Sequence, residues 1–297
     1  MQRFAVAAAG RTLELGDRPR LMGIVNASPD SFSDAGEYLD LDARVARARV
    51  LLAQGADLVD VGGESAITRR PPIDADVEIA RVVPLVRRLV AELDAVVSVD
   101  TYKPAVAAAA IEAGACIVND VSGLRDPALA DVCAATGAAL VLVHTRAAPK
   151  QRLQDPALYD DVVADVCAML SERMAVARDR GMRDEQILLD PGPDFAKTPA
   201  QTIAVLRRLD ELLELGRPLL LAVSRKDFVG ALTARGPRER LAGTLAAIGF
   251  GVDAGAHVLR VHDVAEVAEF LRVRAALRGE LDVASDLSLD ESLRHAR

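Results

Sequence analysis

The sequence predicts an α/β protein, a single (β/α)8 barrel of the TIM type with an N-terminal β-hairpin. Eight apolar runs alternate with helical patterns along the 297 residues. Parallel barrel strands are buried on both faces and therefore read as continuous apolar runs, and strand–helix alternation favours a parallel sheet. The chain has no G-x-G-x-x-G fingerprint, which favours closure into a barrel over an open doubly wound sheet. The length also fits, because a barrel takes roughly 250 residues.

The elements are expected in the following order. Residues 1–20 form the hairpin, with Gly10 at its turn. Residues 21–278 form the barrel, and the acidic segment 279–297 is a poorly ordered tail. The strands are expected at 21–25, 56–61, 96–99, 116–118, 138–143, 187–189, 218–223 and 258–259. The helices between and after them are expected at 42–54, 76–93, 105–113, 126–137, 159–181, 199–215, 238–254 and 263–278.

Composition limits the kind of protein. Hydrophobic residues make up 51% of the chain and aromatics only 3%, with no Trp, so a large core must consist of Ala, Val and Leu. A net charge of -8 argues against nucleic acid as a partner. The longest apolar runs are too short to cross a membrane, and no signal peptide is apparent. The three cysteines are far apart in apolar contexts, which predicts reduced thiols in a cytoplasmic protein.

Polar residues follow the strands, at the end where barrel enzymes have their active sites. Asp100, Asn119 and Asp190 come from three different strands and supply carboxylate acceptors and one amide. Such a trio suits a planar heterocycle that carries amino and ring N–H donors. The alternative, that each acidic residue caps the helix after it, stays open for any one of them.

Positive side chains follow the last two strands. Lys226, Arg260 and His262 lie where barrels often bind phosphate. Asn26 follows the first strand, which is adjacent by barrel closure, and its oxygen could bind Mg²⁺ beside a phosphate. His144 could equally be structural. Two polar loops, 26–36 and 64–72, are long enough to act as lids over the mouth or to be ordinary surface turns.

These residues resemble the dihydropteroate synthase family of pterin-binding barrels. The segments that match occur in family order: 22–34, 62–65, 98–101, 119–123, 189–192, 195–198, 224–226 and 260–263. The first and last are the most specific. A methyltransferase-type pterin barrel is a poorer match, because Ser224-Arg225-Lys226 followed by Phe228 is similar to the synthase pattern.

The resemblance implies a reaction and a homodimer. A dihydropterin pyrophosphate loses pyrophosphate, and the amine of p-aminobenzoate attacks the resulting CH₂ carbon. Sulfonamide or sulfone analogues would compete with p-aminobenzoate. The late helices of the barrel form the dimer interface in this family.

The resemblance also implies a role for each matching residue. The pterin would be bound by Asp100, Asn119, Asp190, Lys226 and Arg260. The pyrophosphate would be bound by Asn26, Arg260 and His262, with Asn26 also on Mg²⁺. The aminobenzoate would be bound by Phe32, Thr68, Arg69 and Ser224. The catalytic residues would be Asp100, Lys226 and Asp34.

The sequence departs from the family pattern in four places around the expected site. Ala66-Ile67 is similar to a two-residue insertion in the second loop. Asp194 and Ala222 stand where the family usually has Gly, and Val143 where it usually has Met. Asp194 is expected to add charge beside Asp190 and to raise its pKa. These departures predict a synthase homologue with weakened or lost activity and low pterin affinity. The alternative is a fully active dihydropteroate synthase in folate biosynthesis.

Overall fold

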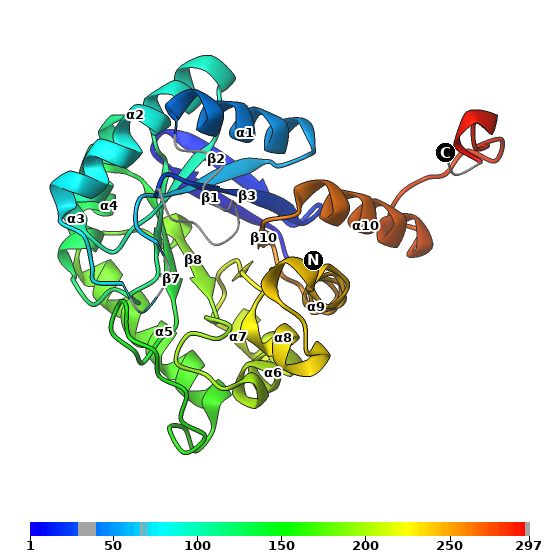
Figure 1. Cartoon of the computed structure of the whole chain (residues 1–297). Helices are drawn as coiled ribbons and strands as arrows, with labels where there is room; N and C mark the ends of the chain where they lie inside the picture. The colour runs from blue at the N-terminus through cyan, green and yellow to red at the C-terminus, as the bar shows by residue number, and fades with distance from the viewer. Residues whose placement is uncertain (29–39, 66–67, 69, 295–297) are drawn as a thin grey trace.

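Eight parallel strands form the central sheet of the computed structural model, which describes residues 1–28, 40–65, 68 and 70–294. Their order is β8-β7-β6-β5-β4-β3-β10-β9. A parallel bridge between Leu189 and Leu219 joins the two ends of this order, so the sheet closes into a barrel (Figure 1). The strands are β3 (Arg20–Asn26), β4 (Leu58–Gly62), β5 (Val97–Asp100), β6 (Ile117–Asp120), β7 (Ala139–Val143), β8 (Ile187–Asp190), β9 (Leu220–Leu221) and β10 (Val258–Val261). The predicted (β/α)8 barrel is confirmed.

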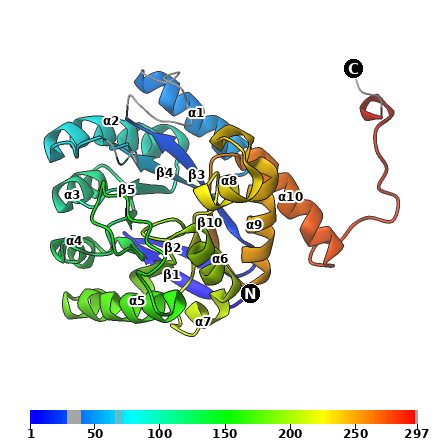
Figure 2. The ribbon, with the colours of Figure 1, turned by 60° about the horizontal axis from the view of Figure 1, so that its bottom comes forward.

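Helices follow the strands and surround the barrel (Figure 2). Residues 199–215, predicted as one helix, form two, because Arg208 between them has the non-helical angles φ -124° and ψ 35°. The longest predicted helix starts later than expected, after Asp161, whose carboxylate accepts hydrogen bonds from the amides of Val163 and Ala164. The helices are α1 (Leu41–Ala53), α2 (Ala75–Leu93), α3 (Pro104–Glu112), α4 (Ala128–Thr136), α5 (Val162–Asp179), α6 (Pro199–Arg207), α7 (Leu209–Leu213), α8 (Asp227–Thr233), α9 (Leu241–Asp253) and α10 (Val264–Leu277). Three short 3₁₀ turns lie at Asp184–Gln186, Pro237–Glu239 and Glu291–Leu293.

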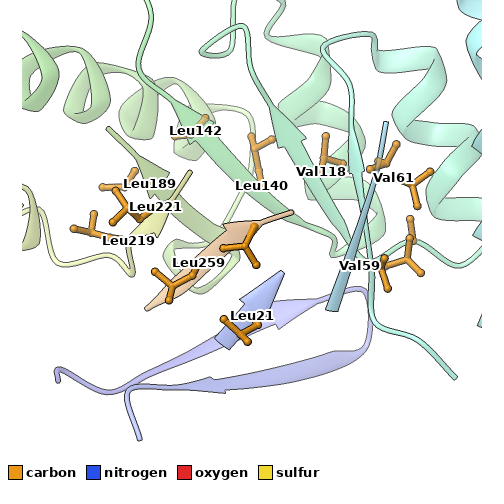
Figure 3. Packing of buried hydrophobic residues seen from close by; sticks show 14 of the residues in the cluster. Leu21, Val59, Val61, Val118, Leu140, Leu142, Leu189, Leu219, Leu221 and Leu259 are labelled. Atoms are coloured by element: carbon orange, nitrogen blue, oxygen red, sulfur yellow. The ribbon is translucent and has the colours of Figure 1, made fainter. Parts of the chain in front are cut away.

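Alternate residues along each strand face opposite sides of the barrel wall, as the pleat requires. One set packs outward against the helices (Figure 3) and includes Leu21, Val59, Leu140, Leu189 and Leu259. The other set fills the barrel interior with Met22, Leu58, Ile117, Val141, Leu188, Leu220 and Val258. Both sets are almost fully buried, so the wall carries a core on each face.

The N-terminal hairpin closes the barrel at the end opposite the carboxyl ends of the strands. Its strands β1 (Phe4–Ala8) and β2 (Arg11–Leu15) pair antiparallel. Val6, Ala8 and Leu15 pack into the same cluster as the interior barrel residues. A cavity of about 290 Å³ lies between the hairpin and the barrel interior, lined mainly by apolar side chains. The predicted hairpin is confirmed. Because it covers one end of the barrel, the carboxyl ends of the strands form the open end.

The segment after α10 leads away from the barrel (Figure 1). Its residues 279–294 are all exposed. Within the described ranges, no helix is long and apolar enough to cross a membrane.

Candidate active site

The expected site residues share the inward phase of their strands. Each lies two residues after another residue of its strand and so on the same face: Asp100 after Ser98, Asn119 after Ile117, Asp190 after Leu188 and Arg260 after Val258. Ile117, Leu188 and Val258 are interior residues of the barrel, so these polar side chains form the next layer toward the mouth. Neighbouring strands are in register there, with Gly62 opposite Asp100 and Asp100 opposite Asn119.

A network of charged and amide groups joins four strands in this layer. The Nε of Arg260 donates to Asp60 Oδ2 at 2.6 Å, and its Nη2 donates to Asp100 Oδ2 at 2.8 Å. Asn119 Nδ2 donates to Asp60 Oδ2 at 3.2 Å. Asp60 Oδ1 and Asn119 Oδ1 are buried and have no hydrogen-bond partner among the described residues. These two acceptors are the kind of group that a ligand with N–H donors would satisfy.

The carboxyl group of Asp100 titrates near neutral pH. Burial raises the pKa of Asp100 to about 7, Arg260 opposes this, and the nearby charge of Asp60 adds to it. Arg260 therefore favours the ionised form that accepts hydrogen bonds, while the buried surroundings favour the neutral form.

Asp190 is almost fully buried at the end of β8. Burial raises the pKa of Asp190 to about 6, against the amide of Gly192 and the charges of Lys226 and Lys197. The Gly192 amide donates to Asp190 Oδ1 at 2.7 Å. Lys226 Nζ lies 4.4 Å from the ring centroid of Phe195, a cation–π contact. Burial lowers the pKa of the Lys226 amine, and the charges of Asp194 and Asp190 oppose that shift.

Ser224 and His262 form a second polar pair beyond β9 and β10. Ser224 Oγ lies 3.0 Å from His262 Nδ1 and accepts a hydrogen bond from the His262 amide at 3.2 Å. Burial lowers the pKa of His262 to about 3, with Arg225 and Arg260 adding to the shift. His262 is therefore neutral at pH 7 and can contact an anion through a hydrogen bond, while Arg260 carries the positive charge.

Asp194 has a different role from the one expected. Its Oδ2 accepts hydrogen bonds from the amides of Asp227 at 2.6 Å and Phe228 at 3.3 Å, at the start of α8. Its Oδ1 accepts from the Thr202 hydroxyl at 3.2 Å. The carboxylate therefore caps a helix. The raised pKa of Asp190 has burial as its main cause, so the expected charge effect of Asp194 is not supported.

The base of the second loop is held by buried ion pairs. Lys103 Nζ lies 2.6 Å from Glu64 Oε2 and 2.5 Å from Glu78 Oε2. Lys150 donates to the carbonyl oxygen of Ser65. Thr68 lies in an exposed turn beyond this base. Phe32, Asp34 and Arg69, and the inserted pair 66–67, lie outside the described residues.

The structure adds three residues that the sequence reasoning missed. Asp60 was read only as part of an apolar strand, although an acidic residue in the inward phase is a signal that could have been used. Lys197 was read only as part of a motif. His144, left open between two roles, is fully buried and bonds to Lys197 and Asp165, so its role is structural.

The chain is similar to known proteins over most of its length. A family profile described as pterin binding enzyme matches residues 22–262. The dihydropteroate synthase of Bacillus subtilis (strain 168) is 38% identical over 266 residues, which is 89% of this chain and 90% of that protein. The chain belongs to the dihydropteroate synthase family.

Two solved structures of dihydropteroate synthases are also similar to this chain. The Xanthomonas albilineans synthase with 4-aminobenzoic acid is 42% identical, with a TM-score of 0.85 over 93% of this chain and 99% of that one. The Yersinia pestis synthase with a sulfonamide drug is 36% identical, with a TM-score of 0.87 over 93% of this chain and 99% of that one. The X. albilineans protein has also been solved in complex with 7,8-dihydropteroate.

Membership of the dihydropteroate synthase family bears on the expectation of lost activity. The relatives that match almost the whole chain carry the synthase name. The expected weakening is not supported, and the alternative of an active synthase is better supported.

A Mg²⁺ ion fits the donors present if it arrives with a pyrophosphate. No group of three or more His, Cys, Asp and Glu side chains that could hold a metal occurs in the part of the chain that the structure describes. Mg²⁺ in phosphate sites needs only one or two protein oxygens beside phosphates and waters. Asn26, the last residue of β3, is in register with Gly62 on β4, which is in turn in register with Asp100 on β5. Its side-chain amide has an oxygen of this kind.

Proposed function

We propose that this chain is a working dihydropteroate synthase that condenses a dihydropterin pyrophosphate with p-aminobenzoate. The observation that carries the proposal is the layer of Asp100, Asn119, Asp190 and Arg260 at the barrel mouth. It offers acceptors for N–H donors beside a buried guanidinium. The ligands named for the X. albilineans synthase, 4-aminobenzoic acid and 7,8-dihydropteroate, support the same substrate class.

The pterin binds by its hydrogen-bonding edge. Asn119 Oδ1 needs a donor, and Asp100 and Asp190 add carboxylates that accept from amino and ring N–H groups once they are ionised. Lys226 faces the pterin carbonyl and a ring nitrogen, and its contact with Phe195 fixes its ammonium at that wall. Arg260 stacks on the pterin face.

The pyrophosphate lies toward β3 and β10. Arg260 supplies the charge and His262 supplies a hydrogen bond as a neutral imidazole. Asn26 is the residue that would hold a Mg²⁺ ion there. When bound, Mg²⁺ neutralises charge that develops on the leaving pyrophosphate. Ser224 beside His262 meets the carboxylate of the aminobenzoate. Phe32, Thr68 and Arg69 cover that substrate, and Asp34 completes the catalytic group with Asp100 and Lys226.

The reaction forms one bond and breaks another at the pterin methylene carbon. The C–O bond to pyrophosphate breaks, and its electron pair leaves with the pyrophosphate. The lone pair of the aminobenzoate nitrogen forms the new C–N bond, and that nitrogen then loses a proton to solvent. The protein contributes by holding the cation-like carbon between two bound partners and by stabilising the leaving group.

We also propose that the chain forms a homodimer through α9 and α10. Phe250 on α9 and Val273 and Leu277 on α10 are more than half exposed, and the two helices are in contact. An exposed apolar group on neighbouring helices favours burial against a second copy. A cytoplasmic location stays a prediction; the three cysteines are free.

The function is tested with the purified protein, Mg²⁺, dihydropterin pyrophosphate and p-aminobenzoate, by measuring dihydropteroate and pyrophosphate together. We expect both products in equal amounts. Calorimetry with Mg²⁺-pyrophosphate should detect binding that Arg260→Ala abolishes. Arg180→Ala, which breaks an exposed pair with Asp131, is the matched control and should bind normally.

Two outcomes would contradict the proposal. One is an unmodified protein that folds but forms no dihydropteroate. The other is failure to support growth of a strain that lacks its own synthase. Unchanged binding of pyrophosphate by Arg260→Ala would contradict the assignment of the anion site to Arg260.

A further inference from the structure

Lys197 is fully buried, with no exposed surface, near the end of the segment that joins β8 to α6. An ammonium group has three N–H donors and no acceptor, so burying it is costly unless each donor has a partner. The proposed reaction gives this residue no task. Its burial therefore needs another explanation.

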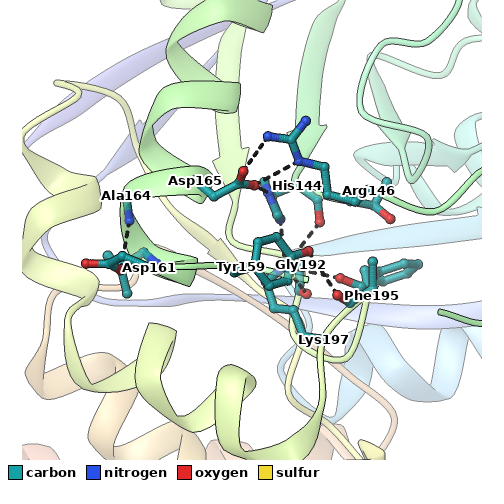
Figure 4. A network of polar contacts seen from close by, with 12 residues as sticks. His144, Arg146, Tyr159, Asp161, Ala164, Asp165, Gly192, Phe195 and Lys197 are labelled. Carbon is teal, nitrogen blue, oxygen red and sulfur yellow. Dashed lines mark hydrogen bonds and ion pairs between the residues drawn. The ribbon is translucent and has the colours of Figure 1, made fainter. Parts of the chain in front are cut away.

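All three donors of Lys197 have partners (Figure 4). Its Nζ lies 2.7 Å from His144 Nδ1, 3.0 Å from the Gly192 carbonyl oxygen and 3.2 Å from the Phe195 carbonyl oxygen. One partner follows β7, and the other two belong to the segment between β8 and α6. Lys197 therefore joins the ends of two barrel strands.

His144 extends this link to α5. Its Nε2 lies 2.9 Å from Asp165 Oδ1, and Arg146 also pairs with Asp165. Burial lowers the pKa of His144 to about 3, with the charge of Lys197 adding to the shift. A neutral imidazole that donates from Nε2 to the Asp165 carboxylate has Nδ1 available as an acceptor for the lysine.

The segment that Lys197 holds has an unusual backbone. Gly192, Asp194 and Ala196 have φ values of 63°, 64° and 51°, a left-handed conformation that glycine adopts freely, that aspartate tolerates and that is strained for alanine. A Cβ on Gly192 would lie 2.0 Å from the His144 carbonyl oxygen, so the segment touches the end of β7. Strained backbone persists where its surroundings fix it, and Lys197 donates to two carbonyl oxygens of this segment, those of Gly192 and Phe195.

The same segment carries part of the pterin site. The Gly192 amide donates to Asp190, the ring of Phe195 lies against Lys226, and Asp194 caps the helix that Lys226 precedes. Tyr159 adds an outer contact, because its hydroxyl donates to the Ala196 carbonyl oxygen at 2.9 Å. A shift of this backbone would therefore move Phe195 and change the surroundings of Asp190 and Lys226 together.

We propose that Lys197 is a positioning residue for the pterin site, which holds the 191–196 segment in the conformation that aligns Asp190, Phe195 and Lys226. The inference rests on the proposed synthase function. We expect Lys197 to affect binding of the pterin and not of the aminobenzoate, because the carbonyl groups that it contacts belong to the segment that follows Asp190.

The test compares steady-state constants and thermal unfolding of the full chain with those of Lys197→Met, which keeps length but removes charge and donors. We expect the KM for dihydropterin pyrophosphate to rise roughly ten- to a hundredfold, while the KM for p-aminobenzoate changes by less than about threefold. Gln186→Met is the matched control. Gln186 is also fully buried, and its side chain donates to two carbonyl oxygens. It lies just before β8, at the opposite end of that strand from Asp190. The variant should lower the melting temperature and leave both KM values near normal.

A milder variant covers the case in which Lys197→Met fails to fold. Tyr159→Phe removes one hydrogen bond to the same segment and should raise the pterin KM by about threefold, with the aminobenzoate KM unchanged. The inference is overturned if the unmodified protein is active and the folded Lys197→Met has a normal KM for the pterin substrate. If Lys197→Met does not fold, a normal pterin KM in Tyr159→Phe has the same meaning. Either result leaves the synthase function intact. An equal rise in Gln186→Met also overturns the inference. An unmodified protein that binds no pterin substrate overturns the synthase function itself.

Discussion

The guanidinium of Arg260 donates through Nε to Asp60, and the two residues lie 200 positions apart in the chain. Arg260 also donates to Asp100, so one partly buried cation pairs with two carboxylates inside the barrel. Asp60 has no exposed surface, and Arg260 is its only cationic partner within the described ranges. The pair therefore fixes Arg260 before any substrate binds.

Breaking this pair should be costly. Asp60→Asn leaves Arg260 with Asp100 as its remaining carboxylate partner, and we expect a loss of about 3 kcal/mol in the free energy of unfolding. Denaturant unfolding measures it. The control Asp253→Asn disturbs exposed pairs with Arg274 and Arg278 and should cost less than about 1 kcal/mol. Equal losses in the two variants would contradict the assigned role of Asp60.

The raised pKa of Asp100 makes substrate binding depend on pH. Because an ionised carboxylate accepts the pterin donors, affinity for the dihydropterin should increase as pH rises through about 7, the pKa of Asp100. Binding titrations across this range measure the effect. Asp100→Asn should bind weakly at every pH, with the slope near pH 7 removed and a slope near pH 6, from Asp190, retained.

The same group has the opposite effect on stability. Its pKa in the folded state is raised above the usual value of 3.8, so the folded state holds a proton that the unfolded state has lost between about pH 4 and about pH 7. Its contribution to stability therefore falls as pH rises across that window. Asp100→Asn should flatten the pH dependence of the free energy of unfolding there. A slope that is identical in the two proteins would mean that Asp100 titrates normally.

Asp194→Asn separates the two roles considered for that residue. If its charge impaired pterin binding, removal would improve affinity. Because the carboxylate caps α8 and supports the charge of Lys226, we expect no gain in affinity and a loss of about 0.5 kcal/mol in stability. Steady-state kinetics and thermal unfolding measure the two effects. A clear fall in the pterin KM would restore the sequence-based expectation.

The oligomeric state tests the apolar face of α9 and α10. The chain of 31.5 kDa should sediment as a dimer, and Phe250→Glu should shift it toward the monomer. Leu232→Glu is the control, since Leu232 on α8 is also strongly exposed but lies on another helix. A monomeric unmodified protein, or dissociation by both variants, would contradict the proposed interface.

The sequence predicted the architecture because local patterns carry that information. Strand runs, helix periodicity and the turn at Gly10 are each local, and the expected elements appear close to their ranges, apart from the break at Arg208. The short helix α8 (Asp227–Thr233) was not expected. The inward phase of Asp100, Asn119, Asp190 and Arg260 follows from the same patterns. This is why their convergence at the mouth was predictable.

The contacts of the site were not predictable in this way. The pairing of Asp60 with Arg260, and the use of Asp194 as a cap for α8, join segments that no local pattern relates. Asp194 and Ala196 have positive φ angles, so the directions of their side chains cannot be predicted from the sequence pattern. Lys197 sits in a recognisable motif, but its burial appears only when β7 and β8 lie side by side.

The closure of the barrel has a consequence for its motion. β9 is two residues long; it pairs with β10 at two positions and connects to the β8 side by a single bridge, whereas the other neighbouring strands share three or more paired positions. Amide protons in such a thinly bonded seam should exchange with deuterium sooner than those of β4 or β7. The seam lies between the strands that lead to Asp190 and Lys226. Opening of this seam would therefore move Asp190 and Lys226 relative to each other.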